Sequence, residues 1–321
     1  MSDQEIVVEA VKLCKEYKGF AAVDDLDLQL DQGDIFGLIG PNGAGKTTAI
    51  KMLATLLKPT SGSVHIYGND ILRSPDKIRG IIGYMPDFFG VYDDLKVWEY
   101  LDFFGAAYKI PKRQRMGLIE DVLELTDLNA KRDSYVRDLS RGMKQRTCIA
   151  KTLIHDPKVL FLDEPASGLD PRARFEIREI LKELGSMGKT ILISSNILPE
   201  LADFCNKIGI IENGKLLLNG YVDDILSKLG AGSVLEIEIH AGMEKAKEIL
   251  HQRPDIDSMD VKGNTIKMQY SGSREDVHKI LTELVNQQVE VSSFHEATLD
   301  LEDAFLKLTK GMGAETVNSN Q

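Results

Sequence analysis

Alternating apolar and polar residues begin the chain and predict β-structure over residues 5–39. Leu26, Leu28 and Leu30 fall on one face of such a strand, with polar residues between them. Short apolar runs at 158–162 and 190–194 are typical of central strands in a parallel sheet. We expect further strands at 62–69 and within 208–219, where Asn213-Gly214 separates two apolar runs and predicts a hairpin.

The middle and the end of the chain have different patterns. From Pro86 to Arg146 the spacing of apolar residues is mostly helical. The composition changes near 230–233 (GAGS), and the predicted order beyond it is strand, helix, strand, strand, helix, strand, which resembles a ferredoxin-like unit. We expect three parts: residues 1–228, with a helical subdomain at about 87–155; a small α+β accessory domain at 232–310; and a disordered tail at 311–321.

The run GPNGAGKTT, Gly40–Thr48, fits the pattern G-x-x-x-x-G-K-[ST]. A strand is predicted before it, at 34–39, and a helix after it, at 48–57. Glycines let the backbone curl so that successive N–H groups surround a β-phosphate at a helix N-terminus. In this pattern Lys46 reaches the β- and γ-phosphates, and the Thr47 hydroxyl ligates Mg²⁺. The residues expected to contact the nucleotide are Asn42, Gly43, Ala44, Gly45, Lys46, Thr47 and Thr48.

Two carboxylates, Asp163 and Glu164, end the apolar run VLFLDE. We expect Asp163 to hold Mg²⁺ through its water shell, and Glu164 to orient or deprotonate the water that attacks the γ-phosphate. A lone acidic pair at a strand end is commonly an ordinary turn. The phosphate-binding pattern upstream and the apolar strand before the pair favour the catalytic interpretation.

Composition restricts the partners. The 321 residues carry a net charge of −11, with 50 Asp and Glu against 39 Lys and Arg, so we expect no nucleic-acid partner. Three distant cysteines without a C-x-x-C pair argue against a zinc site and indicate reduced thiols in a cytosolic protein. We expect no signal peptide, because the N-terminal run MSDQEIVVEA is acidic and lacks a long apolar stretch. We expect no membrane span, because no run of 18 apolar residues occurs. Any membrane role then depends on a partner.

The motifs occur together in an order that resembles one family, the ATP-binding cassette (ABC) ATPases. LSRGMKQR, Leu139–Arg146, is similar to their signature motif, with Ser140, Gly142 and Gln145 at matching positions. Asp170, in ASGLD, looks like the D-loop, and Tyr17 lies where the family stacks an aromatic ring on adenine. The resemblance covers residues 5 to about 225 and is strongest to drug and polysaccharide exporters. It implies an α/β P-loop NTPase fold with a parallel core sheet, an antiparallel β subdomain and a helical subdomain.

The resemblance also implies a mechanism. Two cassettes pair head to tail, as a homodimer or a heterodimer, and ATP lies between the phosphate loop of one and the signature motif of the other. Ser140 and Gly142 suit this position because a hydroxyl, an N–H group and a helix N-terminus donate to phosphate. Hydrolysis would drive a separate integral-membrane permease, for export, with the cassette peripheral at the cytoplasmic face of the plasma membrane. The alternatives are an ATP-binding switch with weak hydrolysis and a soluble ABC ATPase without a transport role.

Three residues depart from the family pattern. Arg141 replaces the first glycine of the signature motif, and its side chain either points away from the nucleotide or adds a positive charge beside it. Asp87 stands where the family has glutamine, and either ligates Mg²⁺ or faces the permease. Asn196 stands where the family has a histidine that senses the γ-phosphate. Because an amide carries neither a proton nor a charge, Asn196 predicts slower hydrolysis.

Aromatic residues are concentrated just after Asp87, where the family receives a coupling helix of the permease. Aromatic side chains are favoured as interface anchors. We expect Phe88, Phe89 and Tyr92 to face the partner. The later aromatic residues, from Trp98 to Tyr108, have helical spacing and are expected to pack inside the helical subdomain.

Overall fold

The computed structural model describes residues 5–88, 90–228, 233–273 and 276–297. The chain divides into two compact units, Met1–Val222 and Asp223–Gln321, which are described separately below. The tail expected at 311–321 and the aromatic side chain of Phe89 lie outside the described residues.

The first unit begins with an antiparallel sheet in the strand order β2-β1-β4-β5. Its first two strands form a hairpin closed at Lys18-Gly19, where φ is 44° and 88°, as a tight two-residue turn requires. Leu26, Leu28 and Leu30 are almost fully buried, as the alternation predicts. The strands are β1 (Ile6–Tyr17), β2 (Phe20–Asp31), β4 (Ser61–Ile66) and β5 (Asn69–Asp70).

A second sheet of six strands has the order β10-β9-β3-β8-β7-β6, in which all neighbours are parallel except β10 and β9. The expected hairpin joins β9 to β10, and Asn213 and Gly214 both have positive φ there. The strands are β3 (Ile35–Ile39), β6 (Ile82–Met85), β7 (Val159–Leu162), β8 (Thr190–Ser195), β9 (Lys207–Glu212) and β10 (Lys215–Tyr221). The carboxyl ends of β3, β8 and β7 are therefore adjacent.

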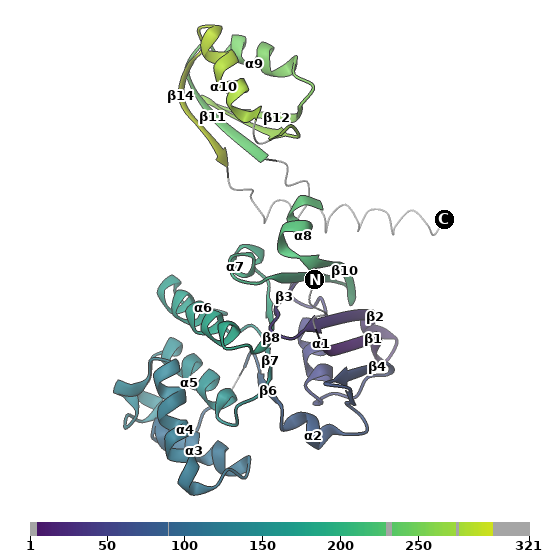
Figure 1. Ribbon diagram of the computed structural model, residues 1–321, viewed down its shortest axis with the longest axis vertical. Helices are drawn as coiled ribbons and strands as arrows, with labels where there is room; N and C mark the ends of the chain where they lie inside the picture. Colours follow the sequence, from purple (N-terminus) through teal and green to yellow (C-terminus); the bar gives the residue numbers. More distant parts are fainter. Residues whose placement is uncertain (1–4, 89, 229–232, 274–275, 298–321) are drawn as a thin grey trace. The chain divides into compact units, whose positions relative to one another are not determined.

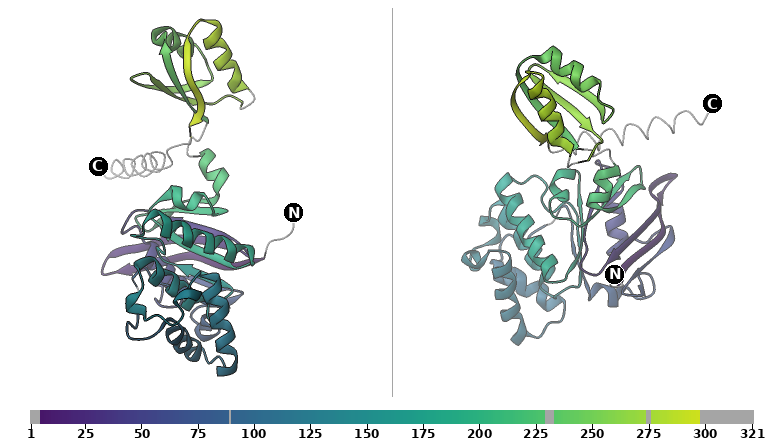
Figure 2. Two further views of the ribbon diagram at one scale, coloured as in Figure 1. Left: turned by 90° about the vertical axis from the view of Figure 1, so that its left-hand side faces the viewer. Right: turned by 45° about the horizontal axis from the view of Figure 1, so that its top comes forward.

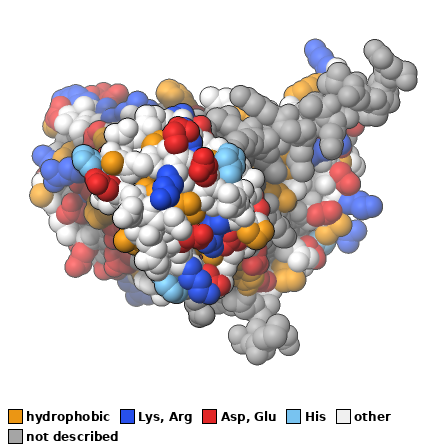
Figure 3. Space-filling model, turned by 90° about the horizontal axis from the view of Figure 1, so that it is seen from above, with side chains coloured by type: hydrophobic (Ala, Val, Ile, Leu, Met, Phe, Trp, Pro, Cys, Tyr) orange, Lys and Arg blue, Asp and Glu red, His pale blue; other side chains and the backbone are white. Residues whose placement is uncertain are grey.

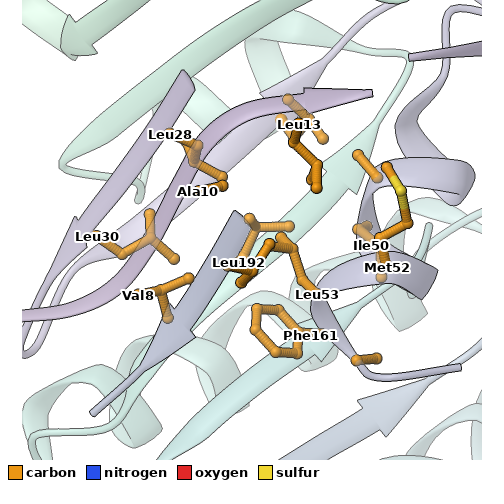
Figure 4. Packing of buried hydrophobic residues seen from close by; sticks show 14 of the residues in the cluster. Val8, Ala10, Leu13, Leu28, Leu30, Ile50, Met52, Leu53, Phe161 and Leu192 are labelled. Carbon is orange, nitrogen blue, oxygen red and sulfur yellow. The ribbon is translucent and has the colours of Figure 1, made fainter. Parts of the chain in front are cut away.

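Helices cover both faces of this sheet (Figure 1). Helix α1 (Lys46–Leu53) packs with the antiparallel sheet on one face, where Phe161 and Leu192 join the core shown in Figure 4. Helix α6 (Pro171–Ser186) and helix α7 (Leu198–Ala202) lie on the other face. Gly37 permits this contact, because a Cβ there would come within 2.9 Å of Leu201.

Helix α1 differs from its expected bounds of 48–57. It starts at Lys46, directly after Gly45, and ends at Leu53. The end has a local cause: Thr55 adopts φ 63°, and the N–H groups of Leu56 and Leu57 both donate to the carbonyl of Lys51. This closing turn stops the helix four residues before the apolar pattern does.

The helical part of the first unit packs α3, α4 and α5 together. Tyr100 and Leu101 are buried there, but Phe103 and Tyr108 are 49% and 43% exposed. The expectation that all the later aromatic residues lie inside is therefore wrong for these two. The helices are α2 (Pro75–Arg79), α3 (Val97–Ala107), α4 (Lys112–Leu125) and α5 (Arg141–Leu153), with short 3-10 turns at Asn129–Lys131 and Val136–Asp138.

The second unit contains an antiparallel sheet in the order β12-β13-β11-β14, with two helices packed on one face (Figure 2). Leu235, Ile237 and Ile239 alternate inward against these helices, while the opposite face is polar. Figure 3 shows acidic and basic side chains interspersed on the side seen from above. The elements are α8 (Val222–Lys228), β11 (Ser233–Ala241), α9 (Met243–His251), β12 (Ile256–Lys262), β13 (Thr265–Tyr270), α10 (Val277–Asn286) and β14 (Glu290–Ala297).

Candidate functional site

Three loops meet at the carboxyl ends of β3, β7 and β8, and each carries residues singled out in the sequence. Gly40, which follows β3, donates its N–H to the carbonyl of Ser195 at 3.3 Å. Asp163 follows β7, and its N–H bonds to the carbonyl of Met85 at the end of β6. Ligands of open parallel sheets bind at this edge, so the topology alone marks it as the candidate site.

The glycines of the phosphate loop have different reasons for lacking a side chain. A Cβ at Gly40 would come within 2.2 Å of the Ile211 carbonyl, and one at Gly45 within 2.4 Å of the Ala22 carbonyl. Gly43 has φ 82° but open space around it. Gly40 and Gly45 thus allow the loop to pack against β2 and β9, while Gly43 supplies backbone curvature beside free space that a phosphate fits.

Lys46 is the buried cation of the site, with 4% of its surface exposed. Its Nζ donates to the carbonyls of Gly40, at 2.7 Å, and Pro41, at 3.2 Å. It also pairs with Glu164 Oε1 at 3.2 Å. The first residue of α1 and the carboxylate after β7 therefore meet, although 118 positions separate them in the chain (164 − 46).

A serine that the sequence interpretation missed organises the two carboxylates. Ser194, on β8, donates its hydroxyl to Asp163 Oδ1 at 2.7 Å and accepts the N–H of Glu164 at 2.9 Å. The backbone of Glu164 has φ 47°, a left-handed conformation that residues other than glycine rarely adopt. Ser194 thus fixes both the buried acid and the strained turn that directs Glu164 toward Lys46.

Asp163 fits a hydrated cation. It is 1% exposed, and its Oδ2 has no hydrogen-bond partner among the described residues. Burial, with Asp163 and Asp87 nearby, raises the pKa of Tyr84 to about 12, so both carboxylates influence this tyrosine. Where the structure describes the chain, no cluster of three His, Cys, Asp or Glu side chains forms a metal cage. The donor set suits Mg²⁺, which takes few protein ligands and completes its shell with water and phosphate.

Asn196 and Glu164 line one cavity of about 570 Å³, which extends between α6 and α7. Asn196 follows β8 directly, and its side chain is exposed. The structure therefore brings together the proposed base and the residue that replaces the family's histidine. Asp87 also lies at this edge, after β6, with an exposed side chain. Thr47 is exposed and Thr48 half-buried at the start of α1.

The signature residues belong to a different surface. Ser140 caps α5 by accepting the N–H of Met143 at 3.3 Å, and Gly142 follows in the first turn. Helix α5 lies on the opposite face of the six-stranded sheet from α1 (Figure 1). Within the described ranges, no hydrogen bond or ion pair joins Ser140 or Gly142 to the phosphate loop. One chain therefore does not bring these two motifs into contact.

Two other expected nucleotide contacts have local partners. Asp170 caps α6, where its Oδ1 accepts the N–H groups of Arg172 and Ala173 at 3.0 Å. Tyr17, at the end of β1, is 47% exposed, with Lys15 Nζ 5.2 Å from its ring centre. The same hairpin contacts the phosphate loop through Ala22, beside Gly45.

Comparison with known proteins agrees with this geometry. The model of the ABC transporter family matches residues 23–167. The Nod factor export ATP-binding protein I of Paraburkholderia xenovorans is 33% identical over 95% of this chain and 97% of its own length. The daunorubicin/doxorubicin resistance ATP-binding protein DrrA of Streptomyces peucetius is 32% identical over 94% and 92%. The chain belongs to the ABC transporter family.

Solved structures show the same fold. The ATP-binding subunit of an ABC transporter has a TM-score of 0.64 and 28% identity, over 74% of this chain and 97% of that one. A bacterial ABC transporter cassette described as dimeric has a TM-score of 0.61 and 24% identity, over 67% and 98%. This chain is thus an ATP-binding transporter subunit and an ABC ATPase. In its described part, no helix has the length and apolarity needed to cross a bilayer.

Proposed function

We propose that this subunit energises export through a separate integral-membrane permease. The names of the two relatives, for Nod factor export and for daunorubicin/doxorubicin resistance, support an outward direction of transport. The observation that carries the catalytic part of the proposal is the convergence of Lys46, Glu164 and Asp163 at one sheet edge. The subunit would lie at the cytoplasmic face of the plasma membrane, held there by the permease.

In this proposal each residue of the edge has one task. The N–H groups of Asn42 to Thr48 surround the β-phosphate, and Lys46 leaves Glu164 to bind the γ-phosphate. The released Glu164 then accepts a proton from the attacking water. Asn196 faces the same cavity and donates its amide to the γ-phosphate. Tyr17 stacks on adenine, at the hairpin that touches the phosphate loop.

Mg²⁺ is proposed as the second cofactor, with Thr47 and Asp163 as its protein partners. When bound, it would neutralise charge between the phosphates. The unpaired, buried Oδ2 of Asp163 supports this assignment, because a buried acceptor without a partner is costly. Asp87 is proposed as a further partner, through water, because its charge already influences Tyr84 beside Asp163.

Two copies, or this chain and a related cassette, are proposed to pair around ATP. The phosphate loop and the signature motif lie on different faces of one cassette, so each ATP would need Ser140 and Gly142 from the partner. Asp170, near the same surface, would contact the partner's nucleotide. Solved cassettes of the family support the arrangement, since one is described as dimeric.

The permease is proposed to dock on the aromatic surface formed by Phe88, Tyr92 and Phe103. Phe88 is 90% exposed and Tyr92 53%, and Tyr92 packs edge-on against Phe103 at 5.4 Å between ring centres. Apolar side chains this exposed are typical of interface anchors. Changing Phe88 and Tyr92 together to Ser should abolish copurification with the permease and leave the basal ATP turnover unchanged. The control is Leu72→Ser, at another exposed site; equal copurification of both proteins would contradict this surface.

Within the second unit, residues 232–310 are proposed to form a ferredoxin-like accessory domain, and α8, at the start of that unit, is proposed to belong to a cassette at 1–228. The strand order β12-β13-β11-β14 supports this class, because a β-α-β-β-α-β chain of that type places its first and third strands in the centre. The helical subdomain is proposed at about 87–155.

Glu164→Gln tests the catalytic proposal. An amide of the same shape accepts no proton, so ATP turnover should fall by about 10²- to 10⁴-fold while ATP binding is retained. Steady-state phosphate release and fluorescent-nucleotide binding measure the two properties. Glu179→Gln, on α6 and paired with the exposed Lys182, serves as a control for loss of a carboxylate. Undiminished turnover in Glu164→Gln would contradict the assignment.

A further inference from the structure

The N-terminal part of α5 is attached to the segment that follows Glu164. Gln145 donates its side-chain amide to the carbonyl of Pro165 at 2.5 Å, in a buried position. A Cβ at Gly142 would meet the Cβ of Ala173 at 3.0 Å, so α5 also packs closely on the start of α6. The signature helix and the segment 165–170 therefore form one contact region within a single cassette.

Arg141 adds a contact to this region that a glycine could not make. Its Nη2 donates to the carbonyl of Ser167 at 3.1 Å. Its guanidinium covers Gly168, where an added Cβ would come within 2.4 Å of Nη2 and 2.7 Å of Cζ. Gly168 has φ 66°, a backbone conformation that disfavours a side chain, and an added methyl group would also displace the guanidinium above it.

We propose that Arg141 is a positioning residue that links the signature motif to the catalytic Glu164 of the same chain. This rests on the proposed roles of Glu164 and of the signature motif. Ser167 lies three residues after Glu164, and its N–H already bonds to the Glu164 carbonyl at 3.1 Å. A displacement of α5, when a second cassette binds, is thereby transmitted through Arg141 and Ser167 to the strained turn at Glu164.

The side chain suits this task chemically. A guanidinium presents several N–H donors in one plane, so it holds a carbonyl while covering the adjacent Cα. The contact is exposed, so its strength is that of a single hydrogen bond partly screened by water. Its loss should therefore reduce the rate of hydrolysis without unfolding the site, because Gln145 and the α5–α6 contact remain.

The test compares Arg141→Gly with Arg141→Lys, using Arg137→Ala as the control. Arg137 is a nearby arginine that pairs with Asp94 instead. In Arg141→Gly, kcat for ATP should fall about fivefold, while KM and the Kd for ATP stay within twofold. Arg141→Lys should recover part of kcat, since its ammonium still reaches a carbonyl. Arg137→Ala should match the wild type. An unchanged or increased kcat in Arg141→Gly would overturn the proposal, as would a rise in KM alone, which would place Arg141 on the nucleotide.

A double-mutant cycle with Gly168→Ala distinguishes loss of the contact between Arg141 and the segment at Ser167 and Gly168 from a general loss of structure. In the wild type the new methyl group collides with the guanidinium, and in Arg141→Gly only the backbone strain remains. Gly168→Ala should therefore lower kcat more in the wild type than in Arg141→Gly. Equal effects in both backgrounds would overturn the proposal. If Glu164→Gln loses turnover but Arg141→Gly does not, the link through Arg141 alone is refuted. If Glu164→Gln keeps normal turnover, the proposed catalytic role of Glu164, on which the link rests, is refuted.

Discussion

At the scale of single residues, the site depends on a serine hydroxyl that joins two loops. Ser194 bonds to the buried Asp163 and to the backbone of Glu164, so its removal leaves a buried carboxylate with no partner. Ser194→Ala should therefore reduce the free energy of unfolding by about 1–3 kcal/mol. Urea unfolding measured without nucleotide gives this quantity directly.

The adjacent residue provides the matched control. Ser195 is also buried, but among the described residues its hydroxyl has a single partner, the N–H of Ile197, which it accepts at 3.0 Å. Ser195→Ala should cost less than Ser194→Ala and leave ATP turnover close to that of the wild type. A larger loss of stability at Ser195 than at Ser194 would show that the link to Asp163 is not the important contact.

Asn196 sets the expected speed of hydrolysis. It lines a cavity together with Glu164, and we expect a histidine at this position to reach the γ-phosphate with a charge-assisted hydrogen bond. Such a bond is worth about 1.5–3 kcal/mol, and Asn196→His should raise ATP turnover about 10- to 100-fold. Turnover with the permease present is the measurement, and Asn196→Ala is the control that adds no donor. No gain in the histidine variant would contradict this role.

From the sequence we could propose those residues of the candidate site whose spacing along the chain is informative. Lys46 and Thr47 follow from the glycine pattern, and Asp163 and Glu164 from the acidic end of a buried strand. Ser194 had no such signal, because a serine near the end of an apolar strand is common and its partner lies 31 positions earlier. Only the pairing of β7 with β8 brings the two together.

At the scale of elements, the junction between α5 and β6 is sensitive to pH. His155 stacks on Tyr108 at 3.7 Å and bonds through Nε2 to the Ile82 carbonyl. Burial lowers the pKa of His155 below its ordinary value, although the Ile82 carbonyl and Asp156 act in the opposite direction. Lys189 adds to the lowering. The folded chain therefore favours the neutral ring, whereas the unfolded chain takes up a proton near pH 6.5.

The direction in which stability changes with pH follows from this difference in pKa between the folded and the unfolded chain. The unfolded state binds more protons between the two pKa values, so stability is full above about pH 6.5 and is lost as the pH falls toward the lower folded pKa. His155→Phe, which keeps an aromatic ring beside Tyr108, should lose less stability than the wild type as the pH falls. The two losses of free energy of unfolding should differ by at most about 1.4 kcal/mol per pH unit. Urea unfolding followed by the fluorescence of Trp98, the single tryptophan, measures it. His251→Gln is the exposed control, and equal pH dependence of His155→Phe and the wild type would contradict the assignment.

Most elements were predictable because their patterns are local. The alternation in β2 and the Asn-Gly turn between β9 and β10 gave correct strands. The predicted end of α1 was wrong because the turn at Thr55 depends on backbone geometry and not on apolar spacing. The predicted burial of Phe103 and Tyr108 was wrong for another reason. Helical spacing identifies which side chains share a face, but the packing of neighbouring helices decides whether that face is buried.

At the scale of the whole molecule, the central claim is that one cassette contains two separate halves of an ATP site. Lys46 and Glu164 form one half, on loops that end parallel strands. Ser140 and Gly142, at the start of α5, are proposed to form the other. Because the two halves do not meet within one chain, ATP should hold two cassettes together until it is hydrolysed.

The most direct measurement of this claim is the mass of the Glu164→Gln chain in solution by light scattering. Adding ATP should double its mass, because the variant binds ATP without removing it. A second change, Ser140→Asp, keeps a capping side chain on α5 and places a carboxylate where the phosphate of the partner should lie; it should return the mass to that of one chain while ATP binding remains. A doubled mass that survives Ser140→Asp, or a single-chain mass with ATP bound to Glu164→Gln, would contradict the account.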